Sequence, residues 1–101
     1  MRIFVMLAPT NVRGTKTAYT KFRKRLVASG FVMLQAEVYM KAVPNREVAA
    51  TQMELLTKNA PPTGTVRAFT MTERQFAAMH YLTGGPDYQE RMVGAKKQVE
   101  L

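Results

Sequence analysis

The spacing of apolar and polar residues predicts alternating strands and helices along most of the chain. Short runs of apolar, β-forming residues predict four strands, over Arg2–Leu7, Phe31–Gln35, Val38–Lys41 and Thr65–Met71. Two longer segments carry apolar residues three and four positions apart, which is typical of helices with one buried face. These helices are expected from Thr15 to about Ser29 and from Asn45 to about Asn59. Between the second and third strands, residues 36–37 form either a tight connection or a bulge.

Capping residues indicate where the helices begin and end. Thr15 is expected to be the N-cap of the first helix, and Gly30 the residue just past its C-terminal end. Asn45, after Pro44, is expected to be the N-cap of the second helix. Thr72 and Gln75 match a capping box, which predicts a third, short helix running through Leu82.

The order β-α-β-β-α-β predicts an α+β protein of the ferredoxin-like class, with an antiparallel sheet and both helices on one face. Residues 1–83 would form this domain, including the short C-terminal helix, and residues 84–101 a tail. Within that tail, residues 91–101 are either loose or a further strand that needs a partner. Because one face of the sheet is left uncovered, we expect a homodimer formed sheet to sheet.

Composition excludes several classes of chemistry. The chain has 101 residues and no cysteine, which excludes disulfides, thiol catalysis and iron–sulfur clusters. Its single histidine, His80, cannot anchor a histidine-rich metal site. No apolar run approaches the roughly 20 residues that span a bilayer, and the N-terminal segment does not resemble a signal peptide. We therefore expect a cytoplasmic protein with no membrane association.

Charge is concentrated at one end of the sequence. The net charge is +8, and residues 1–36 carry seven Lys and Arg residues with no acid, or +7. Residues 37–101 carry the other eight bases against seven acids, or +1. A patch of one sign without interleaved acids predicts an anionic ligand, most simply the phosphates of a nucleic acid.

Several separated motifs resemble one family, the CRISPR-associated protein Two, in the variety found beside type II systems. The motifs are Ala18–Lys24 (AYTKFRK), Gly30–Gln35 (GFVMLQ), Val38-Tyr39, Asn45-Arg46, Pro61-Pro62-x-Gly64-x-Val66-Arg67 and Thr70–Phe76 (TMTERQF). They keep the family's order and spacing over about residues 1–82, whereas the tail resembles the family only loosely.

This resemblance implies a ferredoxin-like homodimer that acts in spacer acquisition. In the family the dimer lies between two dimers of the CRISPR integrase, CRISPR-associated protein One, and double-stranded DNA crosses it through backbone contacts. The basic residues after the first strand and on the first helix become candidate DNA contacts: Arg13, Lys16, Lys21, Arg23 and Lys24. The family's C-terminal segment often adds a strand to a neighbouring subunit, which would give residues 91–101 a partner.

The end of the first strand departs from the family. Many members are described as metal-dependent nucleases with an Asp there, and two such carboxylates across the dimer axis could hold Mg²⁺. Here Val5–Thr10 (VMLAPT) contains no acid, Ala8 stands in the place of the Asp, and the chain's one Asp is Asp87. Glu37 occupies a position where the family usually has Ser. We therefore assign no catalytic residue, no metal ligand and no cofactor.

Three functions remain open. The first is a dimeric adaptor that binds duplex DNA and bridges integrase subunits. The alternative is a metal-dependent endonuclease of the same family, acting on RNA or DNA, with Glu37 as a substitute acid. A third is a stand-alone RNA binder, which is disfavoured because strands Arg2–Leu7 and Thr65–Met71 lack aromatic pairs that would stack bases.

Overall fold

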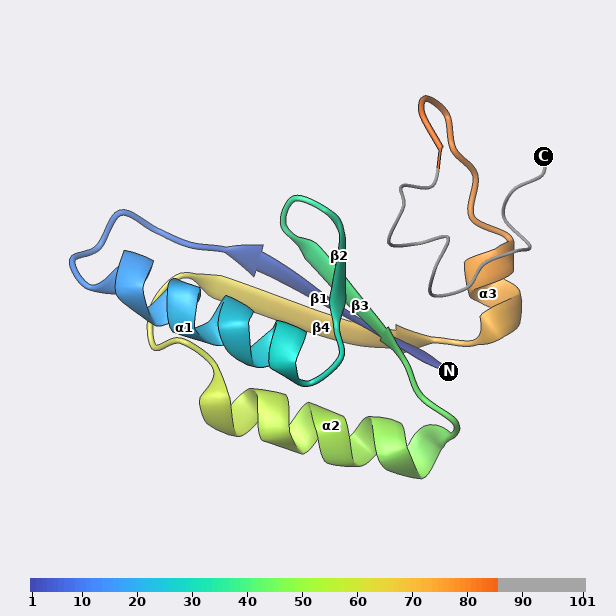
Figure 1. Ribbon diagram of the computed structural model, residues 1–101, viewed down its shortest axis with the longest axis horizontal. Coiled ribbons are helices and arrows are strands. Elements are labelled where there is room, and N and C mark those ends of the chain that lie inside the picture. Colours follow the sequence, from blue (N-terminus) through green and yellow to red (C-terminus); the bar gives the residue numbers. More distant parts are fainter. Residues whose placement is uncertain (86–101) are drawn as a thin grey trace.

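A four-stranded antiparallel sheet forms the centre of the computed structural model, which describes residues 1–85 (Figure 1). The strands are β1 (Arg2–Ala8), β2 (Val32–Gln35), β3 (Val38–Ala42) and β4 (Thr65–Met71). The helices are α1 (Thr15–Ala28), α2 (Arg46–Asn59) and a short α3 (Glu73–Ala77). The strand order β2-β3-β1-β4 confirms the predicted ferredoxin-like class. The predicted tail strand at 91–101 lies outside the described residues.

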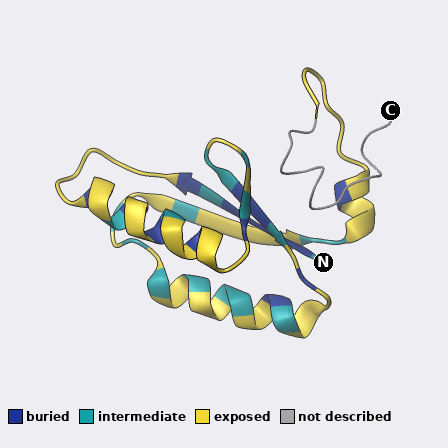
Figure 2. Cartoon of the chain, in the orientation of Figure 1, coloured by how far each residue is buried: buried dark blue, intermediate teal, exposed yellow. Residues whose placement is uncertain are grey.

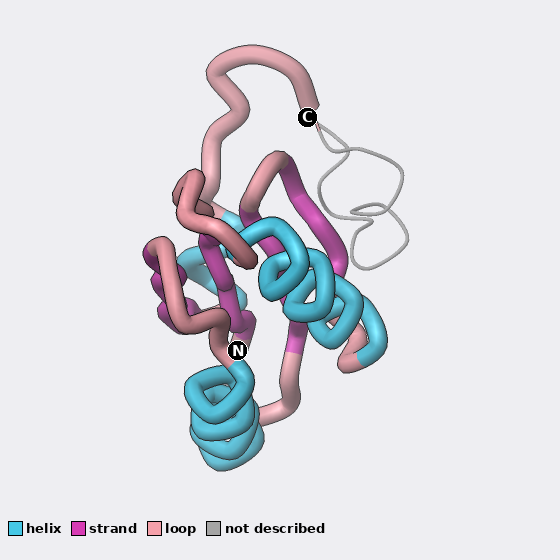
Figure 3. Tube along the Cα trace, turned by 90° about the vertical axis from the view of Figure 1, so that its left-hand side faces the viewer, coloured by secondary structure: helices cyan, strands magenta, loops and turns pink. Residues whose placement is uncertain are grey.

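The main core lies between the inner face of the sheet and the two long helices. Because side chains alternate along a strand, Ile3, Val5 and Leu7 of β1 all point to this face and are buried. From α1, Tyr19, Phe22 and Leu26 pack against them at helical spacing, and α2 contributes Ala49, Met53 and Leu56. Figure 2 shows the buried stripes on the strands and the exposed outer side of each helix. Figure 3 shows α1 and α2 nearly end-on, both belonging to this one layer.

The first helix begins one residue away from the predicted cap. Gly14 is the N-cap, at φ 85°, and makes no side-chain cap bond. Thr15 is instead the first residue of the helix itself, and its buried hydroxyl lies 2.6 Å from that of Thr63. At the other end Gly30, at φ 100°, confirms the prediction, since its N–H bonds the carbonyl of Val27 at 3.0 Å.

The connection between β2 and β3 combines both predicted alternatives. Gln35 pairs with Val38, so Ala36–Glu37 make a two-residue connection. The register shifts between Met33 and Gln35, which places an irregularity just before the turn rather than in it.

The caps of the later helices are as predicted, but α3 is shorter. The Asn45 side chain accepts a 2.9 Å bond from the N–H of Val48, and Thr72 and Gln75 form the reciprocal capping box. However, α3 ends at Ala77 instead of Leu82. The residues after it are exposed, with Leu82 at 95%, so they bury too little surface to stabilise further helical turns.

The outer face of the sheet is partly covered, contrary to the expectation that it is open. A second buried cluster is formed there by Phe4, Met40 and Phe76, the last from α3. Arg2 helps to hold α3, because its guanidinium lies 2.9 Å from the Glu73 carboxylate and 4.0 Å from the centre of the Phe76 ring. Most of the rest of this face is apolar and only partly shielded, through Val32, Leu34, Val38 and the 39% exposed Phe69. The exposed Arg67 of β4, opposite Met6, also lies on this face.

Candidate nucleic-acid interface

The five predicted contact residues lie on one element and the loop that leads into it. Arg13 is in the loop between β1 and α1, and the others follow along α1: Lys16, Lys21, Arg23 and Lys24. At roughly 1.5 Å per residue the helical part of the row, from Lys16 to Lys24, extends about 12 Å, or about a third of the 34 Å turn of B-DNA. Within residues 1–85, none of the four exposed members has a carboxylate within ion-pair distance.

Helical periodicity divides these bases between two sides of α1. Lys21 and Lys24, three residues apart, are exposed and lie on the side of α1 away from its buried stripe. Lys16 and Arg23, seven residues apart, share a flank of the helix. The outward side therefore presents two adjacent ammonium groups to solvent.

Arg23 differs from the other bases because it is already paired. Its Nε and Nη2 atoms donate to the two carboxylate oxygens of Glu37, at 3.1 and 2.8 Å. These hydrogen bonds raise the pKa of the Arg23 guanidinium above its ordinary value. Nearby, burial first and the Glu37 charge second raise the pKa of the Tyr39 hydroxyl, while Arg23 acts in the opposite direction.

A cluster of hydroxyl groups holds the start of α1 in place. Tyr19 Oη donates a 2.8 Å bond to the carbonyl of Thr63, and the Thr15 hydroxyl lies 2.6 Å from that of Thr63 and 3.4 Å from that of Thr10. Together these contacts attach the basic loop and the first turn of α1 to the segment before β4. We did not predict them, because polar contacts between segments so far apart leave no local pattern.

Arg2 makes no contribution to the exposed charge. It is 6% exposed and paired with Glu73, whereas Arg25, absent from the predicted set, is exposed on α1 and lines a groove with Leu55 of α2. Arg25 comes four residues after Lys21, so helical spacing places the two as neighbours and could have added Arg25 to the predicted set. Nothing local to Arg2, in contrast, indicates that it is buried.

The residues at the end of β1 do not fit a magnesium site. Ala8 is exposed there and offers no ligand. Glu37 is close in the backbone, since its carbonyl accepts a 3.0 Å bond from the N–H of Leu7, but its carboxylate is engaged by Arg23. No three His, Asp or Glu side chains among residues 1–85 gather into a metal-binding group. Within the described residues, the end of β1 therefore offers no cluster of the carboxylate oxygens that Mg²⁺ prefers.

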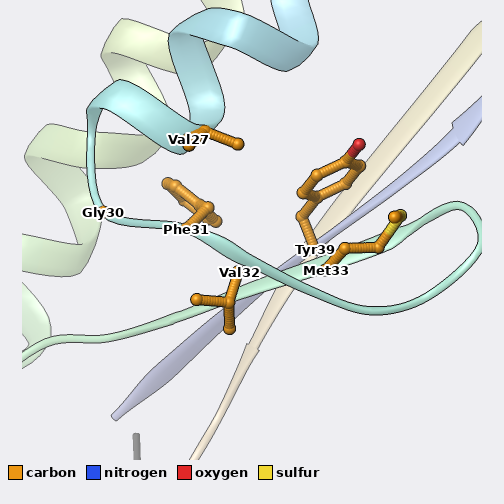
Figure 4. A pocket seen from close by; sticks show the side chains of 6 residues that line it. All are labelled: Val27, Gly30, Phe31, Val32, Met33 and Tyr39. Atoms are coloured by element: carbon orange, nitrogen blue, oxygen red, sulfur yellow. The ribbon is translucent and has the colours of Figure 1, made fainter. Parts of the chain in front are cut away.

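A shallow apolar hollow of about 350 Å³ lies where α1 meets β2 (Figure 4). Val27 lines it from the helix, while Phe31, Met33 and Tyr39 line it from the sheet side. Its lining contains no acid or base beyond the Tyr39 hydroxyl, so it lacks the paired groups that acid–base catalysis needs.

In the described part of the chain, no helix is both long and apolar enough to cross a membrane.

Comparison with known proteins agrees with this fold and these motifs. Residues 12–79 match the family model described as CRISPR associated protein Cas2. Three similar proteins are each named CRISPR-associated endoribonuclease Cas2. The one from Acidovorax ebreus is 38% identical over 94% of both chains. The one from Streptococcus mutans UA159 is 40% identical over 86% of this chain and 81% of the relative. The one from Treponema denticola is 38% identical over 83% and 84%. The chain therefore belongs to the Cas2 family of CRISPR-associated proteins.

Proposed function

We propose that this protein is a dimeric adaptor in CRISPR spacer acquisition, which binds duplex DNA through its phosphate backbone and bridges integrase subunits. The observation that carries the proposal is the row of exposed, unpaired bases on one helix, beside a strand end that lacks metal ligands. Lys and Arg side chains on a rigid helix attract phosphates without reading sequence. Such a surface is suited to holding a duplex rather than cutting it.

The proposed DNA contacts are the bases that have no acidic partner. Lys21 and Lys24 point outward together, and Lys16 and Arg13 extend the row toward the loop. Phosphate contact should release counterions, so affinity should fall steeply with salt, with a logarithmic slope of roughly −0.9 per phosphate neutralised.

A paired charge reversal tests this surface. The double variant K21E/K24E should bind a 30-base-pair duplex at least tenfold more weakly than the unchanged protein, measured by fluorescence anisotropy. The matched control R46E/K58E changes the net charge equally, but on the exposed surface of α2. Equal loss of affinity in both variants would mean that only net charge matters and would contradict the assignment to α1.

The bridging role rests on the resemblance and on the exposed remainder of the outer sheet face. We propose that two copies pair through that face and that the dimer binds the integrase. Co-expression with the integrase of the same CRISPR locus should yield one complex by size-exclusion chromatography. Separate elution at micromolar concentrations would contradict bridging while leaving DNA binding intact.

A second candidate function is metal-dependent cleavage of RNA, favoured by the names of the relatives and by the position of Glu37 beside the end of β1. The described residues provide no ligand set for it, so we place it second. The test incubates labelled single-stranded RNA and duplex DNA with Mg²⁺ or Mn²⁺. Cleavage that EDTA abolishes, and that E37Q also abolishes, would favour this function over the adaptor without catalysis.

The stand-alone RNA binder stays third, although one reason against it was wrong. Phe4 and Phe69 do form an aromatic pair across β1 and β4, stacked at 5.2 Å between ring centres. Phe4, however, is 5% exposed and lies between Phe69 and Phe76. Its ring therefore stacks within the protein and is not available to a base.

A further inference from the structure

Glu37 is the one acidic residue in the first 46 positions of the chain, and it lies against the basic helix. Every other base of the α1 surface, within residues 1–85, lacks a carboxylate partner. The acid therefore acts on a single cation, Arg23, at the flank of α1 that also carries Lys16.

Several contacts stabilise the ion pair between Arg23 and Glu37. The Nε and Nη2 atoms of Arg23 each donate to a different carboxylate oxygen of Glu37, at 3.1 and 2.8 Å. A bidentate pair of this kind is stronger than a single hydrogen bond. Each side chain is 31% exposed, so water screens the pair less than it screens a fully exposed one. The Tyr19 ring centre lies 6.0 Å from the guanidinium carbon, which gives Arg23 a second neighbour besides Glu37.

The backbone also fixes Glu37 in position. It belongs to the two-residue connection between β2 and β3, and its carbonyl accepts the 3.0 Å bond from Leu7 at the end of β1. Because the backbone of Glu37 is already fixed by the sheet, no flexible loop has to become ordered when its carboxylate pairs with Arg23. A DNA phosphate would have to displace it, and would bring its own negative charge close to that of Glu37.

We propose that Glu37 sets the border of the DNA-binding surface by holding Arg23 out of contact with phosphate. This inference rests on the proposed function and names the residue that limits the extent of the DNA-binding surface. DNA then contacts the outward side of α1, through residues such as Lys21 and Lys24, and is repelled only from the part of the flank around Arg23, beside the β2–β3 connection. Lys16, about two helical turns before Arg23 on that flank, stays within the DNA-binding surface. Arg23 is a structural cation in the unchanged protein and becomes a phosphate contact only when Glu37 is neutralised.

The experiment is a double-mutant cycle on the salt dependence of DNA binding. The unchanged protein, R23Q, E37Q and R23Q/E37Q are titrated with one 30-base-pair duplex at several salt concentrations. E54Q is the matched control, because Glu54 is exposed on α2 and forms no ion pair within the described residues. Thermal melts establish that each variant is folded.

The proposal makes distinct predictions for each variant. R23Q should leave the slope of log K against log salt unchanged within about 0.3, whereas E37Q should steepen it by about 0.9, the value for one added phosphate contact. In R23Q/E37Q the slope should return to that of the unchanged protein, and E54Q should not alter it.

Two results would overturn the inference while leaving the proposed function standing. A slope reduced by about 0.9 in R23Q alone would mean that DNA displaces Glu37 and contacts Arg23. An equally steep slope in E37Q and R23Q/E37Q would mean that Glu37 acts through its charge and not through Arg23. Absence of DNA binding by the unchanged protein would instead overturn the proposed function, and this inference with it.

Discussion

Tyr19 Oη donates a 2.8 Å hydrogen bond to the backbone carbonyl of Thr63, although the two residues are 44 positions apart. The bond connects the first long helix to the segment that precedes β4, beside the end of β1. Tyr19 is fully buried, so its hydroxyl depends on this carbonyl, and not on water, for a hydrogen-bond partner. The orientation of the basic loop and of the first turn of α1 therefore depends on a contact that lies outside the basic surface.

Replacing Tyr19 by Phe should destabilise the fold by about 1 kcal/mol, because the ring still fills the core while the carbonyl of Thr63 loses its donor. For a domain of this size, that loss lowers the melting temperature by about 4–8 °C. Calorimetry measures the shift. The control Thr17→Val removes an exposed hydroxyl on the same helix and should change the melting temperature by less than 2 °C, roughly the effect of a neutral surface change. Equal shifts in both variants would contradict a specific role for the bond.

Gly64→Ala should be more damaging than Gly14→Ala, although both glycines have positive φ, at 77° and 85°. A Cβ at Gly64 would collide with Tyr19 Oη and lie 2.8 Å from the carbonyl oxygen of Ala8, whereas nothing lies within 4 Å at Gly14. Both variants carry the cost of the left-handed conformation, about 1 kcal/mol or more. The difference in urea midpoints between them isolates the collision. Indistinguishable midpoints would mean that the Tyr19 side chain moves aside freely.

Stability should fall below about pH 5 through Glu73. Hydrogen bonds from Arg2, opposed in part by burial, hold the pKa of the Glu73 carboxyl below its ordinary value. A carboxyl with a lowered folded pKa contributes stability above its unfolded pKa, near 4.3, and loses that contribution as the pH drops through the folded value. Urea unfolding at pH 7, 5 and 3.5 should show a smaller decline in Glu73→Gln than in the unchanged protein. The control Glu54→Gln, which removes an exposed carboxylate without an ion pair, should retain the full decline.

Phe69→Lys should weaken self-association if the outer sheet face joins two copies. Phe69 is 39% exposed on that face and stacks on Phe4, so an ammonium group there would be buried against apolar side chains of the partner. Sedimentation equilibrium should show at least a tenfold increase in the dissociation constant. Leu55→Lys is the control, since Leu55 is 47% exposed on the helical side of the molecule. Weaker association in the Leu55 variant, with none in the Phe69 variant, would place the interface on the helices.

Local signals account for the parts of the fold that were predicted correctly. Asn45, Thr72 and Gly30 each act on backbone groups within three or four residues, so their roles can be deduced from neighbouring positions alone. The strands and long helices follow from apolar residues that recur about every 2 or every 3.6 positions, and this pattern is equally local. Where the prediction was wrong, the tertiary surroundings decided the outcome: Thr15 bonds Thr63 instead of capping its helix, and α3 ends just after the buried Phe76 because the residues that follow are exposed.

The sequence alone determined the element order, the ferredoxin-like class, the family and the concentration of positive charge at the start of the chain. Only the tertiary structure decided which of those charges can meet a ligand. Arg2 is paired with Glu73 and Arg23 with Glu37, while Lys21 and Lys24 remain exposed. The physical reason is that a charge is neutralised by what lies within a few ångströms in space, and the sheet brings together acids and bases that are 71 and 14 residues apart in the chain.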